Sequence, residues 1–193
     1  MTSEEISRTR KTADLLCSAH GKLRDKFRQR ALLLDVLLLI ASSFLVLHVL
    51  ADKNFLEKIN IFGVEYNNLL SGLSILVFVL SVLELRVDWK GQAQAHSKSY
   101  ALYAEVKREL GYLQGSTRLI KADVRRVMSK YDMASELGTN ISEKDFLKLK
   151  QNHREKIELS KYLDTHPSAN ILLTRLKFLW RDNISHGKND SSN

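Results

Sequence analysis

Residues 31–51, ALLLDVLLLIASSFLVLHVLA, form an almost wholly apolar stretch of 21 residues that decides the fold class. A membrane-spanning helix needs about 20 apolar residues, because each residue advances about 1.5 Å across about 30 Å of hydrocarbon. The stretch has that length, yet it contains Asp35 five residues from its basic flank, Ser42 and Ser43 near its middle, and His48 near its end. Any functional interpretation has to explain why so apolar a stretch contains an acid.

A second apolar block, NLLSGLSILVFVLSVLEL, covers residues 68–85 and is bracketed by Tyr66 and Trp89, two residue types that anchor spans at membrane interfaces. Both blocks are apolar on every face, whereas a core helix of a soluble bundle keeps a polar stripe. We therefore favour two membrane spans over two buried helices of a soluble protein. A signal peptide is a poor alternative, since thirty mostly polar residues precede the first block.

The charges flanking the two blocks predict their orientation. Residues 1–30 contain eight Lys or Arg residues, and the connection 52–67 contains only Lys53 and Lys58. Basic residues also follow the second block, beginning with Arg86 and Lys90. The positive-inside rule therefore places both termini in the cytoplasm and the connection outside. The formal net charge of +8 favours anionic partners such as phospholipid headgroups.

The remainder of the chain is predicted to be helical, because it contains only one proline and eight glycines. Cys17 is the single cysteine, so an intrachain disulfide is impossible. An apolar stripe in residues 1–30 predicts one long helix that enters the membrane, and the second span should run on to Gly111 or Gly115. The two extensions should pack antiparallel. The members of the N-terminal stripe are Ile6, Ala13, Leu16, Leu23 and Phe27.

Three further helices are expected. The first lies in 116–138, and the second lies in 140–167, with Ser142 or Asn140 as its cap and Pro167 closing it. The third, in 168–182, is apolar and basic. It could pack on the other helices or lie on anionic lipid, and we favour packing because the helical core needs covering.

The sequence thus predicts an all-α membrane protein, a two-helix transmembrane hairpin extended into a cytoplasmic helical bundle. The lipid bilayer is its first predicted partner. The predicted segments are a cytoplasmic amphipathic helix (1–30), transmembrane helix 1 (31–51), a short periplasmic connection (52–67), transmembrane helix 2 (68–88), a cytoplasmic helical region (89–183) and a disordered tail (184–193).

Signatures of enzymes are missing from the sequence. There is no glycine-rich phosphate loop and no histidine pair at zinc spacing, so we expect no enzyme activity, no cofactor and no metal site. The six histidines are scattered and are interpreted as packed or solvated residues. Basic clusters carry acids within the same helical turns, so direct binding of nucleic acid is not expected.

The polar residues of the two spans are the candidate functional residues. At about 100° per residue, Asp35 and Ser42 nearly superimpose, and the polar residues of the second span fall within an arc of about 140°. Asp35 and Glu84 each lie about 7.5 Å inside the cytoplasmic boundary. The candidate pore-lining or helix-packing residues are Asp35, Ser42, Ser71, Ser74, Ser81 and Glu84.

Two interpretations of these residues remain open. In the first, they line a watery axis in a homo-oligomer, because two helices alone cannot enclose a channel, and a ring of acids at the inner mouth attracts cations. In the second, the serines hold helices together, and Asp35 turns toward the headgroups or pairs with Arg86. Charges near the end of a span are tolerated, so the acids alone do not decide between the two.

The layout resembles the SLATT family, two-transmembrane effectors found beside bacterial nucleotide-signalling and reverse-transcriptase defence genes. The resemblance covers about residues 8–180. It rests on the basic N-terminal helix, the two apolar blocks, the stretch AHSKSYALYAEVKREL and the segment NISEKDFLKLKQNHREKIELSKYLDTHP, which is similar to the subgroup associated with reverse transcriptases. The family has no catalytic motif from which residue roles could be carried over.

The resemblance implies a multi-pass protein of the bacterial inner membrane that permeabilises this membrane when triggered. The expected outcome is growth arrest or death of the infected cell, as in abortive infection and antiviral defence. It also implies that the sensor is a separate partner, such as a nucleotide-signalling or reverse-transcriptase protein. A membrane anchor or scaffold that tethers a cytoplasmic partner without conducting ions is the main alternative, and a small ion-transport subunit is a weaker one.

Overall fold

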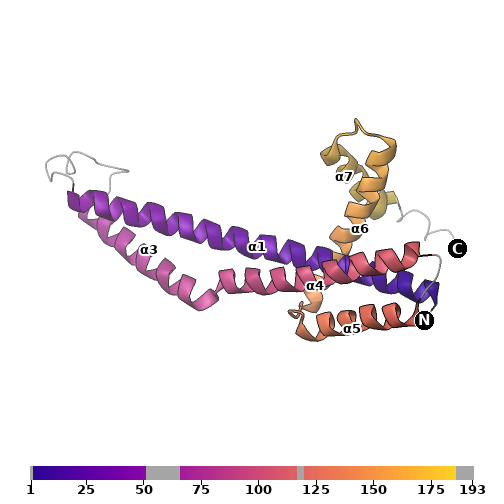
Figure 1. Ribbon diagram of the computed structural model, residues 1–193. Coiled ribbons are helices and arrows are strands. Elements are labelled where there is room, and N and C mark those ends of the chain that lie inside the picture. The colour runs from indigo at the N-terminus through magenta and orange to yellow at the C-terminus, as the bar shows by residue number, and fades with distance from the viewer. Residues whose placement is uncertain (1, 51–65, 117–119, 186–193) are drawn as a thin grey trace. The chain divides into compact units, whose positions relative to one another are not determined.

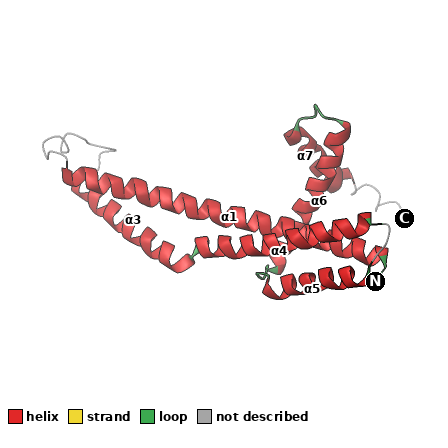
Figure 2. Ribbon diagram, viewed as in Figure 1, coloured by secondary structure: helices red, strands yellow, loops and turns green. Residues whose placement is uncertain are grey.

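The computed structural model describes residues 2–50, 66–116 and 120–185, and every regular element in these ranges is a helix (Figures 1 and 2). The chain forms two compact units, Met1–Thr139 and Asn140–Asn193. The all-α class is as the sequence predicted. The elements are α1 (Ser3–Leu50), α3 (Tyr66–Val87), α4 (Trp89–Gly115), α5 (Lys121–Leu137), α6 (Glu143–Thr165), α7 (Ile171–Trp180) and the π-helical turn η1 (Arg181–Ser185).

Helix α1 runs for 48 residues through both the polar and the apolar parts of the N-terminal sequence. It begins with a reciprocal cap in which the Thr2 amide donates to Glu5 Oε2 (2.7 Å) and the Glu5 amide donates to Thr2 Oγ1 (3.3 Å). Glu4 and Glu5 in the first turn also stabilise the helix, because their negative charges interact favourably with the positive end of its dipole. The expectation of one uninterrupted helix is confirmed.

Residues 3–30 of α1 pack with α4 and α5 around one apolar core, and we call these three segments the packed half of the first unit. Paired residues show that α1 and α4 are antiparallel: Lys107 binds Asp14 near one end (2.6 Å) and His20 contacts His96 further along. Gly21 allows close approach, since a Cβ there would lie 3.2 Å from the Tyr100 ring. The core residues are Ile6, Ala13, Cys17, Tyr103, Val106, Leu110, Val127 and Ala134.

Helix α5 turns back along α4. Its Lys130 ammonium group binds Glu105 and Glu109 of α4. Beyond the end of α5, the Thr139 amide donates to Ser99 Oγ at 2.9 Å, so the first unit ends beside the early part of α4.

Residues 31–50 of α1 and all of α3 contrast with this core, and we call them the open half. Helix α3 lies beside the apolar part of α1 (Figure 1). Leu39 of α1 is 66% exposed and Phe78 of α3 is 69% exposed. Two helical stretches, Ser3–Leu47 and Leu70–Gly115, are long and apolar enough to cross a membrane.

The second unit contains α6, α7 and η1. The Ser142 side chain caps α6 by accepting from the Asp145 amide (3.2 Å), which confirms one of the two predicted caps. Asn170 Oδ1 caps α7 by accepting from the Leu172 amide at 2.9 Å. Helix α7 contacts α6 through Phe178, whose ring meets that of Tyr162 edge-on at 5.8 Å.

The structure sets some segment boundaries differently from the sequence-based prediction. The region 89–183, treated as one in the sequence, is divided between the two units after Thr139. Of the connection 52–67, residues 52–65 lie outside the described residues, and the last two belong to α3. Of the tail 184–193, residues 184–185 belong to η1 and residues 186–193 lie outside the described residues.

Candidate functional site

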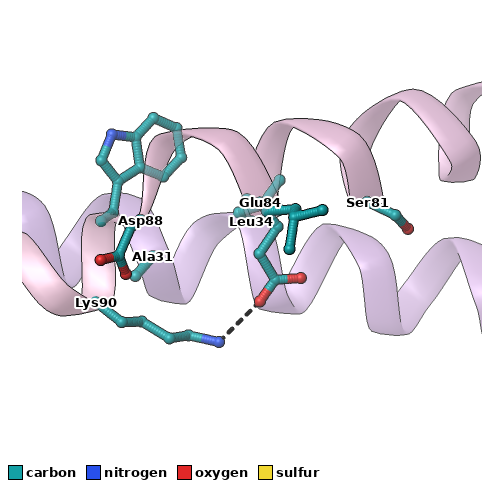
Figure 3. A pocket seen from close by; sticks show the side chains of 8 residues that line it. Ala31, Leu34, Ser81, Glu84, Asp88 and Lys90 are labelled. Carbon is teal, nitrogen blue, oxygen red and sulfur yellow. Dashed lines mark hydrogen bonds and ion pairs between the residues drawn. The ribbon is translucent and has the colours of Figure 1, made fainter.

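Three charged side chains from three helices meet where α3 gives way to α4. Lys90 Nζ lies 2.7 Å from Asp35 Oδ1 on α1 and 2.9 Å from Glu84 Oε1 on α3. Figure 3 shows the Lys90 side chain extended toward Glu84. The structure therefore brings together the two acids that the sequence singled out, and it does so through one ammonium group. The sequence suggested Arg86 as a partner for Asp35, whereas the structure gives Lys90.

A sharp break in the helix positions Lys90. We expected the second span to continue smoothly, but Asp88 adopts a left-handed conformation (φ 43°, ψ 52°) between α3 and α4. Its Oδ1 accepts from the Gly91 amide at 2.9 Å and caps α4. In an unbroken helix, Lys90 would lie about 240° around the axis from Glu84, pointing elsewhere. The break is what allows one lysine to reach both acids.

Glycine is needed at position 91 for this cap. A Cβ on Gly91 would lie 2.1 Å from Asp88 Oδ2, which is far inside contact distance. On the other side of the break, Gln92 Nε2 donates to the Val87 carbonyl oxygen (3.0 Å), which satisfies an acceptor that the end of α3 leaves open.

A cavity of about 360 Å³ opens beside the charged cluster. Leu34 and Ala31 of α1 form an apolar side, and Glu84 with Lys90 forms a charged side (Figure 3). With Asp88 also in the lining, two acids and one base surround this cavity. The lining residues are Ala31, Leu34, Ser81, Glu84, Leu85, Asp88, Trp89 and Lys90.

The serines of the open half bind their own helices. Ser42 Oγ donates to the Leu39 carbonyl oxygen (3.1 Å), and Ser74 and Ser81 donate to the carbonyl oxygens of Leu70 (3.0 Å) and Val77 (2.9 Å). Each hydroxyl is therefore satisfied within one helix.

The serine face of α3 lies beside its contact with α1 rather than within it. Ser71, Ser74 and Ser81 are exposed. Partly buried residues of α3 instead follow one another at steps of four, three, four and three, the spacing of a helix–helix seam. They are Leu73, Val77, Leu80, Glu84 and Val87.

A second polar cluster, which the sequence analysis missed, lies inside the packed half. His20 and His96 are 2% and 5% exposed, and their Nδ1 atoms are 3.0 Å apart. The His20 ring stacks on Tyr103 (centroids 5.5 Å apart), and the His96 ring stacks on Phe27 (5.6 Å). The signal was present in the predicted stripe of α1, because His20 continues it between Leu16 and Leu23 at steps of four and three.

Both histidines are neutral in this arrangement. Burial, and then the neighbouring His96, lower the pKa of His20 from 6.5 to about 4, and burial also lowers the pKa of His96. One Nδ1 carries the hydrogen and the other accepts it, so the pair has opposite tautomers. Protonation of one histidine would place a charge in the core. Protonation of both would leave no ring nitrogen to accept the hydrogen bond between them.

No group of three or more His, Cys, Asp or Glu residues arranged to hold a metal ion is found among the described residues. The Nδ1 atoms of His20 and His96 lie at hydrogen-bond distance from each other, at 3.0 Å.

Comparison with known proteins finds no matching family model, no matching curated protein and no matching solved structure. The similarity to the SLATT family stays a prediction from the sequence. The features that bear on function are the exposed apolar helices and the charged cluster at their polar end.

Proposed function

We propose that this protein is a bacterial inner-membrane effector that oligomerises to form a pore or otherwise disrupt the membrane. The observation that carries the proposal is the exposure of the open half. Only 17% of the apolar window of α1, and none of that of the second helix, is buried. A core helix of a soluble protein would bury most of such a window. Side chains such as Leu39 and Phe78 match hydrocarbon instead.

Oligomerisation follows from the size of the open half. Two helices cannot enclose a channel, so several copies are needed for a pore. The serine face of α3, beside its seam with α1, gives each copy a surface of small polar residues for contact with another copy or with water. Each copy would contribute Asp35, Glu84 and one Lys90 to the mouth, leaving an excess of negative charge that favours cations.

The charge distribution supports a multi-pass topology with both termini in the cytoplasm. The packed half and the second unit would then lie in the cytoplasm, where a separate sensor could act on them. The SLATT resemblance supplies the biological context: a nucleotide-signalling or reverse-transcriptase partner, and growth arrest or cell death during anti-phage defence.

A membrane anchor or scaffold is the second candidate. The observation favouring it is the packed half, whose continuous core gives a partner a stable platform on the membrane. An anchor needs no serine face and no excess of acids at the end of the spans. It also functions as a monomer, whereas a pore does not.

Ion flux and mass distinguish these candidates. Liposomes containing only this protein should release trapped cations faster than protein-free liposomes, and the protein should run in mild detergent as a multiple of 22.1 kDa. A strictly monomeric mass in detergents and nanodiscs, together with protein-free rates of flux, would eliminate the pore and leave the anchor.

The topology has its own test with two matched variants, each carrying one introduced cysteine. A cysteine at Asn60 should react with an impermeant reagent added to intact cells, and one at Lys161 should react only after lysis. Native Cys17 is buried and gives little background. The reverse labelling pattern would overturn the orientation.

A further inference from the structure

Helix α7 presents an apolar face that the described residues leave uncovered. Thr174 and Phe178 are its buried residues and face the rest of the second unit. The opposite side carries four leucines and a tryptophan, and Leu172 among them is 69% exposed. At about 100° per residue these five side chains fill one continuous arc of about 120°, centred opposite the buried pair. They are Leu172, Leu173, Leu176, Leu179 and Trp180.

Basic residues border this face on both sides. Arg175 and Lys177 each fall about 40° beyond one edge of the apolar arc. Arg175 Nε binds Glu155 of α6 at 3.1 Å, and Lys177 Nζ lies 5.6 Å from the centroid of the Tyr162 ring of α6, so both side chains contact α6 at the borders of the apolar face. The helix itself contains no acidic residue. An apolar stripe edged by cations, with tryptophan near its end, is the pattern of a helix lying at a lipid surface.

The end of the first unit keeps α7 within reach of such a surface. Thr139, the last residue of that unit, is held by Ser99 of α4. Ser99 lies ten residues after Trp89, the predicted interfacial anchor, which corresponds to about 15 Å along the helix axis. Helix α6 alone, with 23 residues, is about 34 Å long. The attachment point is thus closer to the bilayer than the length of the segment that bears α7.

From this face, its basic edges and its attachment, we infer that α7 docks on anionic phospholipid of the membrane that the open half enters. The ten residues of α7 are too few to cross a bilayer, so the helix lies in the headgroup region. The predicted packing of this helix holds for its buried side, which packs on α6 through Phe178. The inference adds lipid as the partner of the opposite side. A protein surface is the less favoured occupant, because both residues that border the face are basic and α7 itself contains no acid, which matches a uniformly anionic plane. Of the two, Arg175 is paired with Glu155 of α6 and Lys177 is the cation available to lipid.

The inference rests on membrane insertion of the open half, and the experiment separates the two. Full-length protein carries an environment-sensitive fluorophore at a single introduced cysteine and is reconstituted in liposomes whose lipids carry a nitroxide quencher. The nitroxide is shallow, at headgroup level, for labels in the second unit, and deep, on the acyl chain, for the label in the open half. The liposomes are phosphatidylcholine alone, or phosphatidylcholine mixed with phosphatidylglycerol. The label is placed at Leu176→Cys in α7, at Phe44→Cys in the open half, or at Ser160→Cys on the side of α6 opposite its contacts with α7.

The label at position 176 should be quenched by nitroxide lipid, more strongly with phosphatidylglycerol, while the label at position 160 should not. Adding Lys177→Gln should lower the ratio of docked to free α7 about fivefold in the anionic liposomes, since each cation near an anionic surface contributes a roughly constant attraction. Leu172→Gln should also reduce quenching, and because its side chain is exposed the second unit should keep its fold.

Each other result is decisive. Quenching at position 44 without quenching at position 176 overturns lipid docking and leaves the membrane effector standing. Absence of quenching at position 44 overturns insertion, and the proposed function with it. A label at position 176 that is shielded from aqueous iodide but not quenched by nitroxide lipid shows a protein occupant, which also overturns the lipid assignment.

Discussion

The packed half and the open half share α1, yet apolar side chains are buried in the packed half and exposed in the open half. Where α1 meets α4 and α5, Ile6 and Leu110 are buried almost completely. About nine turns after Ile6 on the same helix, Leu39 is exposed on a surface rich in leucine. Burying apolar surface away from water gains about 25 cal/mol per Å², so only the first arrangement is stable in water. Because the backbone of α1 is continuous, the exposed apolar part needs a different solvent from the packed part: hydrocarbon in place of water.

The largest effect is expected from a matched pair of Leu→Ala substitutions, which tests this contrast directly. Leu110→Ala leaves a void in the core of the packed half and should lower its free energy of unfolding by about 2–5 kcal/mol. Leu39→Ala removes an exposed side chain and should change that free energy by less than about 0.5 kcal/mol. Urea unfolding in nanodiscs, followed by a fluorophore on α4, measures both. Equal effects would mean that the open half also contains a packed core.

Acid should weaken the packed half selectively. The pKa of His20 is about 4 in the folded protein and about 6.5 when unfolded, so the unfolded chain takes up the proton first as the pH falls. Stability is then fully present above about pH 6.5 and decreases by up to about 1.4 kcal/mol per pH unit for this group, down to about pH 4. His96 acts in the same direction, because its pKa is also lowered.

Urea unfolding at a series of pH values checks this expectation. A His20→Leu, His96→Leu variant should lose the slope, whereas His166→Gln, in the second unit, should keep it. A wild-type protein whose packed half is equally stable at neutral and acidic pH would show that the pair is protonated, or open, in solution.

The junction between the halves is tested by two Gly→Ala substitutions. Gly91→Ala forces the Asp88 carboxylate away and should destabilise the first turn of α4 by about 0.5–2 kcal/mol, the usual contribution of a helix cap. Gly72→Ala, in the open half, meets no atom within 4 Å and should be neutral or slightly stabilising. Hydrogen exchange of the α4 amides reports both. Faster exchange in the Gly72 variant would contradict the described surroundings of α3.

The smallest effect on stability is expected at the ion pairs. Asp35→Asn removes one partner of Lys90 but leaves Glu84, and a partly exposed pair contributes about 0–1 kcal/mol. The same change should lower the cation preference of reconstituted pores, seen as a shift of the reversal potential in planar bilayers. Asp25→Asn, on α1 outside the apolar stretch, is the control and should leave selectivity unchanged. Unchanged selectivity with a destabilised oligomer would make Asp35 purely structural.

The helices were predictable from the sequence where local signals decide them. Periodic apolar positions and few breakers predicted the length of α1, and a serine three residues before an aspartate predicted the start of α6. The nearness of Asp35 and Glu84 was also foreseeable, since both lie at the same depth on facing spans. Helix geometry alone, at about 1.5 Å per residue, predicts this equal depth.

The features that were missed depend on non-local or unusual geometry. Lys90 reaches Glu84 only because Asp88 adopts a backbone conformation that is uncommon for a residue other than glycine. Histidine is as often exposed as packed, so its place on an apolar stripe did not reveal that His20 would meet His96 on another helix.

The uninterrupted length of α1 has a mechanical consequence. Its 48 residues form a rod about 70 Å long that links the two halves without a joint. The return path through α3 and α4 has a joint at Asp88. A displacement of α1 near Ala13 is therefore transmitted along one continuous helix to Asp35, whereas no continuous helix connects α3 with α4. Lys90 lies just past this break and binds one acid on each path, Asp35 on α1 and Glu84 on α3, so these two ion pairs connect the paths at the break.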